Sequence, residues 1–140
     1  MNLTGNFTHS GTSILVGSTT DGGTPNGKII FTGSGTSTFS SATPGNIGYT
    51  NFEVATGKTL ELLSNASLTS QATPVIWGGQ FEVMSGATID MNTFQIVSSS
   101  GVTAGQNNAF ILNATAKVIT ANNNGLGNTT IGSVSTSIAT

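Results

Sequence analysis

Two pairs of carboxylates have a spacing that could support chemistry. Glu82 follows Glu53 at the same interval at which Asp90 follows Glu61. If the stretches that carry them lie on adjacent strands, the two members of each pair face one another about 5 Å apart. Such a pair either binds a cation, for which Ca²⁺ suits oxygen ligands, or forms a solvated row whose repulsion is reduced by water and by the nearby Lys58.

We favour the solvated row over a metal site. A third copy of the pattern has Ile111 and Ile119 where the acids would continue. Ca²⁺ also requires about six to eight oxygen ligands. The expectation is therefore that the protein has no cofactor, with Ca²⁺ at the four carboxylates as the alternative.

The polar residues do not suggest a catalytic centre. Glycoside hydrolysis needs opposed carboxylates about 5–10 Å apart, whereas Glu53 and Glu82 would lie side by side on one wall. The chain has no arginine, three dispersed lysines and a single histidine, His9, with no nucleophile motif beside it. We therefore predict that the protein is not an enzyme and that His9 is a surface residue.

Two aromatic residues are candidate ligand-binding groups, because exposed aromatic rings often stack on sugars. Trp77 lies in PVIWGGQ, just before an expected strand, so packing against the core is its competing interpretation. Tyr49 ends the stretch SSATPGNIGY (40–49), which could form a recognition loop. This hypothesis makes surface glycans a class of partner.

Composition limits the classes of function. Charged residues are 6% of the chain, against about 25% in ordinary soluble domains. There is no basic patch to bind nucleic acid and no run of about 18 apolar residues to enter a membrane. Cysteine is absent, and hydroxyl and amide side chains replace charges. This bias indicates an extracellular protein, either secreted or displayed on a cell surface.

The elements that would position these residues follow from an internal repeat. NFEVATGKTLEL (51–62) returns as QFEVMSGATIDM (80–91), and FILNATAKVIT begins a third copy at Phe110. Apolar and polar residues alternate within each copy, which indicates strands with one buried face, and glycine marks the turns between them. A third apolar column is expected at a constant interval after each Phe. Its members are Leu68, Val97 and Leu126.

Stacking the copies would build one continuous core. The predicted fold is all-β: a right-handed parallel β-helix (β-solenoid) with coils of about 29 residues and three short strands per coil. A β-sandwich is the alternative, because short strands with frequent turns also suit it. The predicted core stack is Phe52, Phe81, Phe110, Val54, Val83, Leu112, Leu60, Ile89 and Val118.

The predicted organisation is a single domain, residues 1–140, with repeat coils at 51–79, 80–108 and 109–137. Residues 1–50 form an irregular N-terminal coil. Within it, NFTHSGTSILV (6–16) resembles the start of the repeat, and Ile29 to Phe31 form a short strand. Residues 33–46 are low in complexity and are expected to be an insertion loop.

The phrase F-x-V-x-x-G-A-T-I-D-M-N and the later KVITANNNGLG resemble β-helical repeats of very large surface proteins exported by the type IX secretion system, including gliding-motility adhesins. The resemblance covers roughly residues 50–130. It implies a structural or adhesive stretch, such as a stalk or spacer, at a bacterial cell surface. A self-assembling filament or fibre subunit and a polysaccharide-binding module are the alternatives. The partners expected are neighbouring repeats or like subunits, together with surface glycans.

Overall fold

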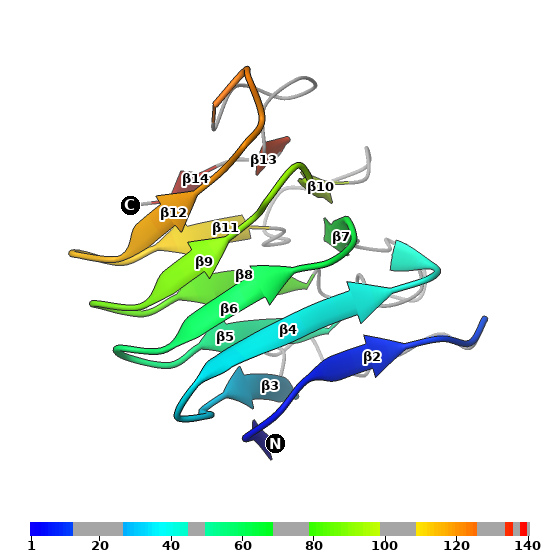
Figure 1. Cartoon of the computed structure of the whole chain (residues 1–140), viewed down its shortest axis with the longest axis horizontal. Helices are drawn as coiled ribbons and strands as arrows, with labels where there is room; N and C mark the ends of the chain where they lie inside the picture. The colour runs from blue at the N-terminus through cyan, green and yellow to red at the C-terminus, as the bar shows by residue number, and fades with distance from the viewer. Residues whose placement is uncertain are drawn as a thin grey trace, which may run out of the picture.

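The computed structural model describes residues 1–12, 27–44, 50–68, 79–98, 109–125, 134–135 and 138–139. All the elements in this part of the chain are β-strands, and all their pairings are parallel. Figure 1 shows them stacked in chain order, from blue at one end to orange at the other. Parallel strands in an all-β chain are consistent with a β-solenoid or parallel β-helix. A β-sandwich would need antiparallel sheets.

The strands form three sheets. The first contains, in spatial order, β1 (Asn2–Leu3), β3 (Lys28–Phe31), β5 (Asn51–Val54), β8 (Gln80–Val83), β11 (Ala109–Leu112) and β14 (Ile138–Ala139). The second contains β2 (Phe7–His9), β4 (Thr36–Ser41), β6 (Thr59–Leu62), β9 (Thr88–Asp90) and β12 (Lys117–Ile119). The third contains β7 (Ala66–Leu68), β10 (Ile96–Ser98) and β13 (Val134–Ser135). We call residues 51–68, 80–98 and 109–119 the three central tiers.

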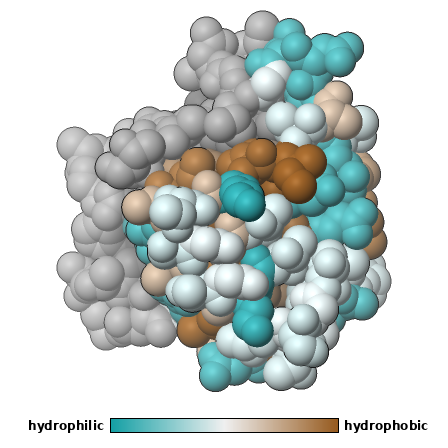
Figure 2. Space-filling model, turned by 60° about the vertical axis from the view of Figure 1, so that its left-hand side comes forward, coloured by the Kyte–Doolittle hydropathy of each residue, from teal (hydrophilic) through white to brown (hydrophobic). Residues whose placement is uncertain are grey.

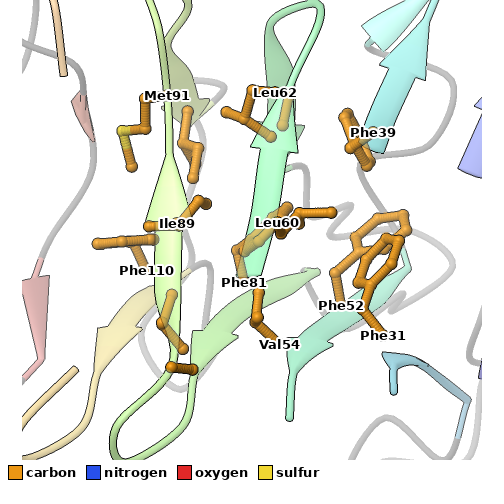
Figure 3. Close-up of a cluster of buried hydrophobic side chains, with 14 of the residues drawn as sticks. Phe31, Phe39, Phe52, Val54, Leu60, Leu62, Phe81, Ile89, Met91 and Phe110 are labelled. Atoms are coloured by element: carbon orange, nitrogen blue, oxygen red, sulfur yellow. The ribbon is translucent and has the colours of Figure 1, made fainter. Parts of the chain in front are cut away.

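Alternation along the strands builds the core. In β5 the side chains of Phe52 and Val54 are buried while Glu53 between them is half-buried, and β8 repeats the pattern. Successive side chains of a strand point to opposite faces, so every second residue enters the space between the sheets. Figure 3 shows these apolar side chains gathered between the first and second sheets. Of the predicted stack, Leu112 and Val118 are partly buried, and the fully buried members are Phe52, Phe81, Phe110, Val54, Val83, Leu60 and Ile89.

Like residues meet in register across the central tiers. Phe52 pairs with Phe81, which pairs with Phe110, so the two steps along the chain are equal in length. The rings of Phe52 and Phe81 are stacked with centroids 5.6 Å apart. Aromatic pairs in such offset arrangements add about 0.5–1.5 kcal/mol to the burial of their area.

Three turns with one backbone pattern join the first sheet to the second, at residues 55–58, 84–87 and 113–116. In each turn the N–H of the fourth residue donates to the carbonyl of the first. The third residue has a positive φ: 70° at Gly57, 71° at Gly86 and 64° at Thr115. Glycine adopts this conformation without steric cost, which explains the T-G-K and S-G-A sequences. The third turn keeps the conformation with a β-branched residue.

The prediction of a loop over residues 33–46 was wrong for residues 36–41, which form β4. Ser37, Phe39 and Ser41 point inward and are buried, while Thr38 and Ser40 alternate with them and are half-buried. Short hydroxyl side chains hid this alternation, although threonine and phenylalanine both favour strands.

The N-terminal segment that resembles the start of the repeat does not occupy the position expected for a repeat copy. Phe7 pairs with Phe39 in the second sheet rather than taking the position of Phe52 in the first. The neighbour of Phe52 on that side is Ile29 instead. The predicted strand over Ile29 to Phe31 is confirmed as part of β3.

The third apolar column is shifted by one position. Ile96, rather than Val97, is fully buried and pairs with Ala66. Leu68 is buried but pairs with Ser98. The second central tier therefore has a single additional residue, relative to the first, between its second and third strands. Leu126 lies outside the described residues.

Gly33 is a point of close backbone approach. A Cβ atom there would lie 2.6 Å from the carbonyl oxygen of Thr4 and 3.1 Å from Oγ of Ser37. Gly33→Ala should therefore separate the N-terminal strands and lower the free energy of unfolding by about 1–3 kcal/mol. Urea denaturation measures the change. Gly35→Ala is the matched control, because a Cβ at Gly35 meets nothing within 4 Å; equal effects of the two substitutions would contradict this packing.

Candidate functional site

The carboxylate pairs lie on adjacent strands, as their spacing predicted. Glu53 of β5 pairs with Glu82 of β8, and Glu61 of β6 pairs with Asp90 of β9. All four residues are half-buried. In the third central tier the rows end at isoleucines, which pair with Glu82 and Asp90. The two rows therefore lie on the outward faces of different sheets and are separate sites.

Lys28 of β3 bridges the first row. Its Nζ donates to Oε2 of Glu53 at 2.7 Å and to Oε2 of Glu82 at 3.1 Å. The ion pairs found in the described part of the chain are both made by Lys28, a residue that the sequence did not single out, rather than by Lys58. Lys28 reaches the row because β3 lies directly beside β5, a position that the spacing of the acids did not reveal.

Asn113 closes the other end of the row. Its Nδ2 donates to Oε1 of Glu82 and to the backbone carbonyl of Val83, each at 3.1 Å. Lys28, Glu53, Glu82 and Asn113, which we call the lysine clasp, thus connect the successive levels of the first sheet from β3 to the end of β11. Both oxygens of Glu82 are hydrogen-bonded within the protein.

Mutual interactions stabilise the charged forms in the clasp. Burial by itself would raise the pKa of Glu82, but hydrogen bonds from Asn113 and Lys28 and the lysine charge lower this pKa below its ordinary 4.5. Burial by itself would lower the pKa of Lys28, but hydrogen bonds to Glu53 and Glu82 and their charges raise it above 10.5. Lys28 Nζ supplies the positive charge that a metal ion would bring to this carboxylate pair. The described residues contain no group of three or more His, Asp or Glu side chains arranged to hold a metal.

Removing the lysine should give a stability change that depends on pH. For Lys28→Met we expect a loss of about 1 kcal/mol near neutral pH, because the lysine side chain is 35% exposed and solvent screens its charge. The pKa of Glu82 is lowered in the folded state, so the ionised carboxylate contributes to stability at pH values above its ordinary pKa of 4.5. This contribution is lost as the pH falls through the folded-state pKa. The pKa of Lys28 is raised in the folded state, so the charged amine contributes to stability at pH values below its ordinary pKa of 10.5. This contribution is lost as the pH rises through the folded-state pKa.

Unfolding free energies of the wild type and of Lys28→Met, measured from acid to alkaline pH, check this expectation. The difference should be largest between about pH 5 and pH 10 and shrink on both sides of that range. Lys117→Met is the matched control, because Lys117 is exposed and forms no ion pair with the described residues. A difference that stays constant down to about pH 3 would show that Lys28 acts through packing rather than charge.

The second carboxylate row is held by a turn. Asn92 donates its backbone N–H to Oδ1 of Asp90 at 2.9 Å and its Nδ2 to Oε1 of Glu61 at 3.1 Å. The same Nδ2 donates to the carbonyl of Leu62 at 2.9 Å. Asn92 has φ of 48°, a left-handed conformation that asparagine tolerates better than most residues. These contacts give both carboxylates a structural role.

Other asparagines connect successive levels of the stack. The side-chain oxygens of Asn6, Asn51 and Asn65 accept hydrogen bonds from backbone N–H groups of the next level, at 2.9–3.0 Å. Together with Asn92 and Asn113 they form a set that we call the asparagine brackets. This role of asparagine was not predicted from the sequence. The available signal was asparagine placed immediately beside apolar strands, where its amide can satisfy backbone groups.

His9 is half-buried in β2. Its Nδ1 lies 3.2 Å from Oγ of Ser41 and 3.4 Å from Oγ1 of Thr43. Ser41 is buried, so its hydroxyl is not presented to a substrate. The prediction of a surface histidine therefore holds only in part, because β2 directs His9 and Phe7 to the same face of the sheet.

Tyr49 and Trp77, the candidate ligand-binding aromatics, lie outside the described residues. On the part of the surface that is described, Figure 2 shows mainly white and teal residues, with a large brown patch near the top and smaller brown areas elsewhere. The large hydrophobic side chains exposed in the described part are Met1, Leu63 and Ile119. The described residues include no apolar helix of membrane-spanning length.

Comparisons with family models, curated proteins and solved structures found no match. Function must therefore be inferred from the physical character of the sites. Glu53, Glu61 and Glu82 accept hydrogen bonds from side chains that are far away in the sequence, and Asp90 accepts one from the backbone N–H of Asn92. Such contacts hold strands together.

Proposed function

We propose that this chain is a structural and adhesive repeat segment, a stalk or spacer, of an extracellular bacterial surface protein. Its architecture in this proposal is a right-handed parallel β-helix with coils of about 29 residues and three short strands per coil. The observation that carries the proposal is the stacking of like residues in register, represented by Phe52, Phe81 and Phe110.

The spacing of the strand pairs supports this architecture. In the first and second sheets the central tiers repeat at one constant interval, and in the third sheet the step from β7 to β10 is longer by a single residue. A repeat that contacts only its neighbours produces an elongated body whose length grows with the number of copies. Length is the property that a stalk requires.

The polar contacts also favour a structural role. The lysine clasp and the asparagine brackets connect strands of different levels. A pulling force along the stack would act on these connections. The resemblance to type IX-exported adhesin repeats agrees with a stalk and is the basis for proposing an extracellular, cell-surface location. Surface glycans remain the expected adhesion target.

A self-assembling filament subunit is the second candidate. β2 and β12 are the outermost described strands of the second sheet. In β12 the backbone groups of Lys117 and Ile119 bond to the residues that flank β9. Because alternate residues of a parallel strand direct their N–H and C=O to opposite sides, those of Val118 point away from the sheet. An open strand edge of this kind can pair with another chain.

Solution mass from light scattering, combined with negative-stain images of the same sample, tests the proposal. Monomers are expected for a stalk segment, whereas fibres or a defined trimer would make assembly the function. A thermal-shift screen with bacterial and host polysaccharides tests adhesion, because a ligand that binds only the folded state raises the melting temperature.

A further inference from the structure

We draw no further inference here: the strongest candidate, the outer edge of β12, where the backbone groups of Val118 point away from β9 and Ile119 is 52% exposed, belongs to the second candidate function already described, and nothing in the described residues shows what covers it.

Discussion

Phe81→Ala is expected to lower the free energy of unfolding by about 3–5 kcal/mol, the range found for buried aromatic residues. Phe81 is fully buried in the middle of the first sheet and pairs with phenylalanines on both sides. Its ring stacks on Phe52 and meets the edge of Phe39 with centroids 6.0 Å apart. Truncation would therefore leave a cavity bordered by two tiers, whose strands cannot close it without breaking their register.

Denaturant unfolding monitored by circular dichroism measures this loss. The matched control is Ile119→Ala, since Ile119 is a large apolar residue of a strand in the second sheet but is 52% exposed. Surface substitutions of this kind change stability by about 0.5 kcal/mol or less. A loss below about 1 kcal/mol for Phe81→Ala would mean that the aromatic stack does not hold the tiers together.

Phe39→Ala is expected to have an effect of similar size, about 3–5 kcal/mol. Phe39 is fully buried, and the centroid of its ring lies 5.3 Å from the ring centroid of Phe7 and 5.2 Å from that of Phe52. It therefore connects the N-terminal strands to the central tiers. If residues 33–46 were instead an external loop, the same substitution would change stability very little.

Thr36→Ala provides the control within the same strand, because Thr36 begins β4 and is exposed. Its expected change is within about 0.5 kcal/mol. A large loss for Phe39→Ala together with a small one for Thr36→Ala establishes that one face of β4 is buried. Equally small losses of stability for the two substitutions would support the original prediction that residues 33–46 form a loop.

The sequence predicts the central tiers well for a physical reason. Phe52, Phe81 and Phe110 are large residues that fit only the interior, and their equal spacing determines which residues become neighbours across strands. The register of the central tiers in the first two sheets follows from that spacing, including the carboxylate pairs. The spacing does not predict the register of β10. A single additional residue between the second and third strands of the second tier places Ile96 rather than Val97 in the core.

The N-terminal part resists prediction because its alternation is carried by small residues. In β4 only Phe39 is strongly apolar, while Ser37 and Ser41 occupy inward positions usually filled by aliphatic side chains. The step from β3 to β5 is shorter than the step from β5 to β8, so a search at the interval of the repeat does not align Lys28 with the acids. This offset hid the cation of the lysine clasp, although both carboxylates had been paired.

Side-chain bonds to the backbone are also outside the reach of a pattern search. Asn51 accepts from the N–H of Gln80, and Asn65 accepts from that of Gln95. Both contacts depend on where a turn leaves the strand, which hydrophobic periodicity does not specify. The left-handed backbone of Thr115 is a comparable case, because threonine gives no sign of a positive φ. Only its alignment with Gly57 and Gly86, at the same turn position, indicates that conformation.

The parallel pairing has a consequence for how the chain reaches its native state. Each described pair joins segments that are far apart in the sequence, and none is a hairpin that could form by itself. Closing such loops costs chain entropy before any contact is gained, so formation of the first pair should be slow. Once one level exists, its edge serves as a template for the next, and growth can proceed in either direction. A chain built in this way can acquire its structure progressively, one level at a time.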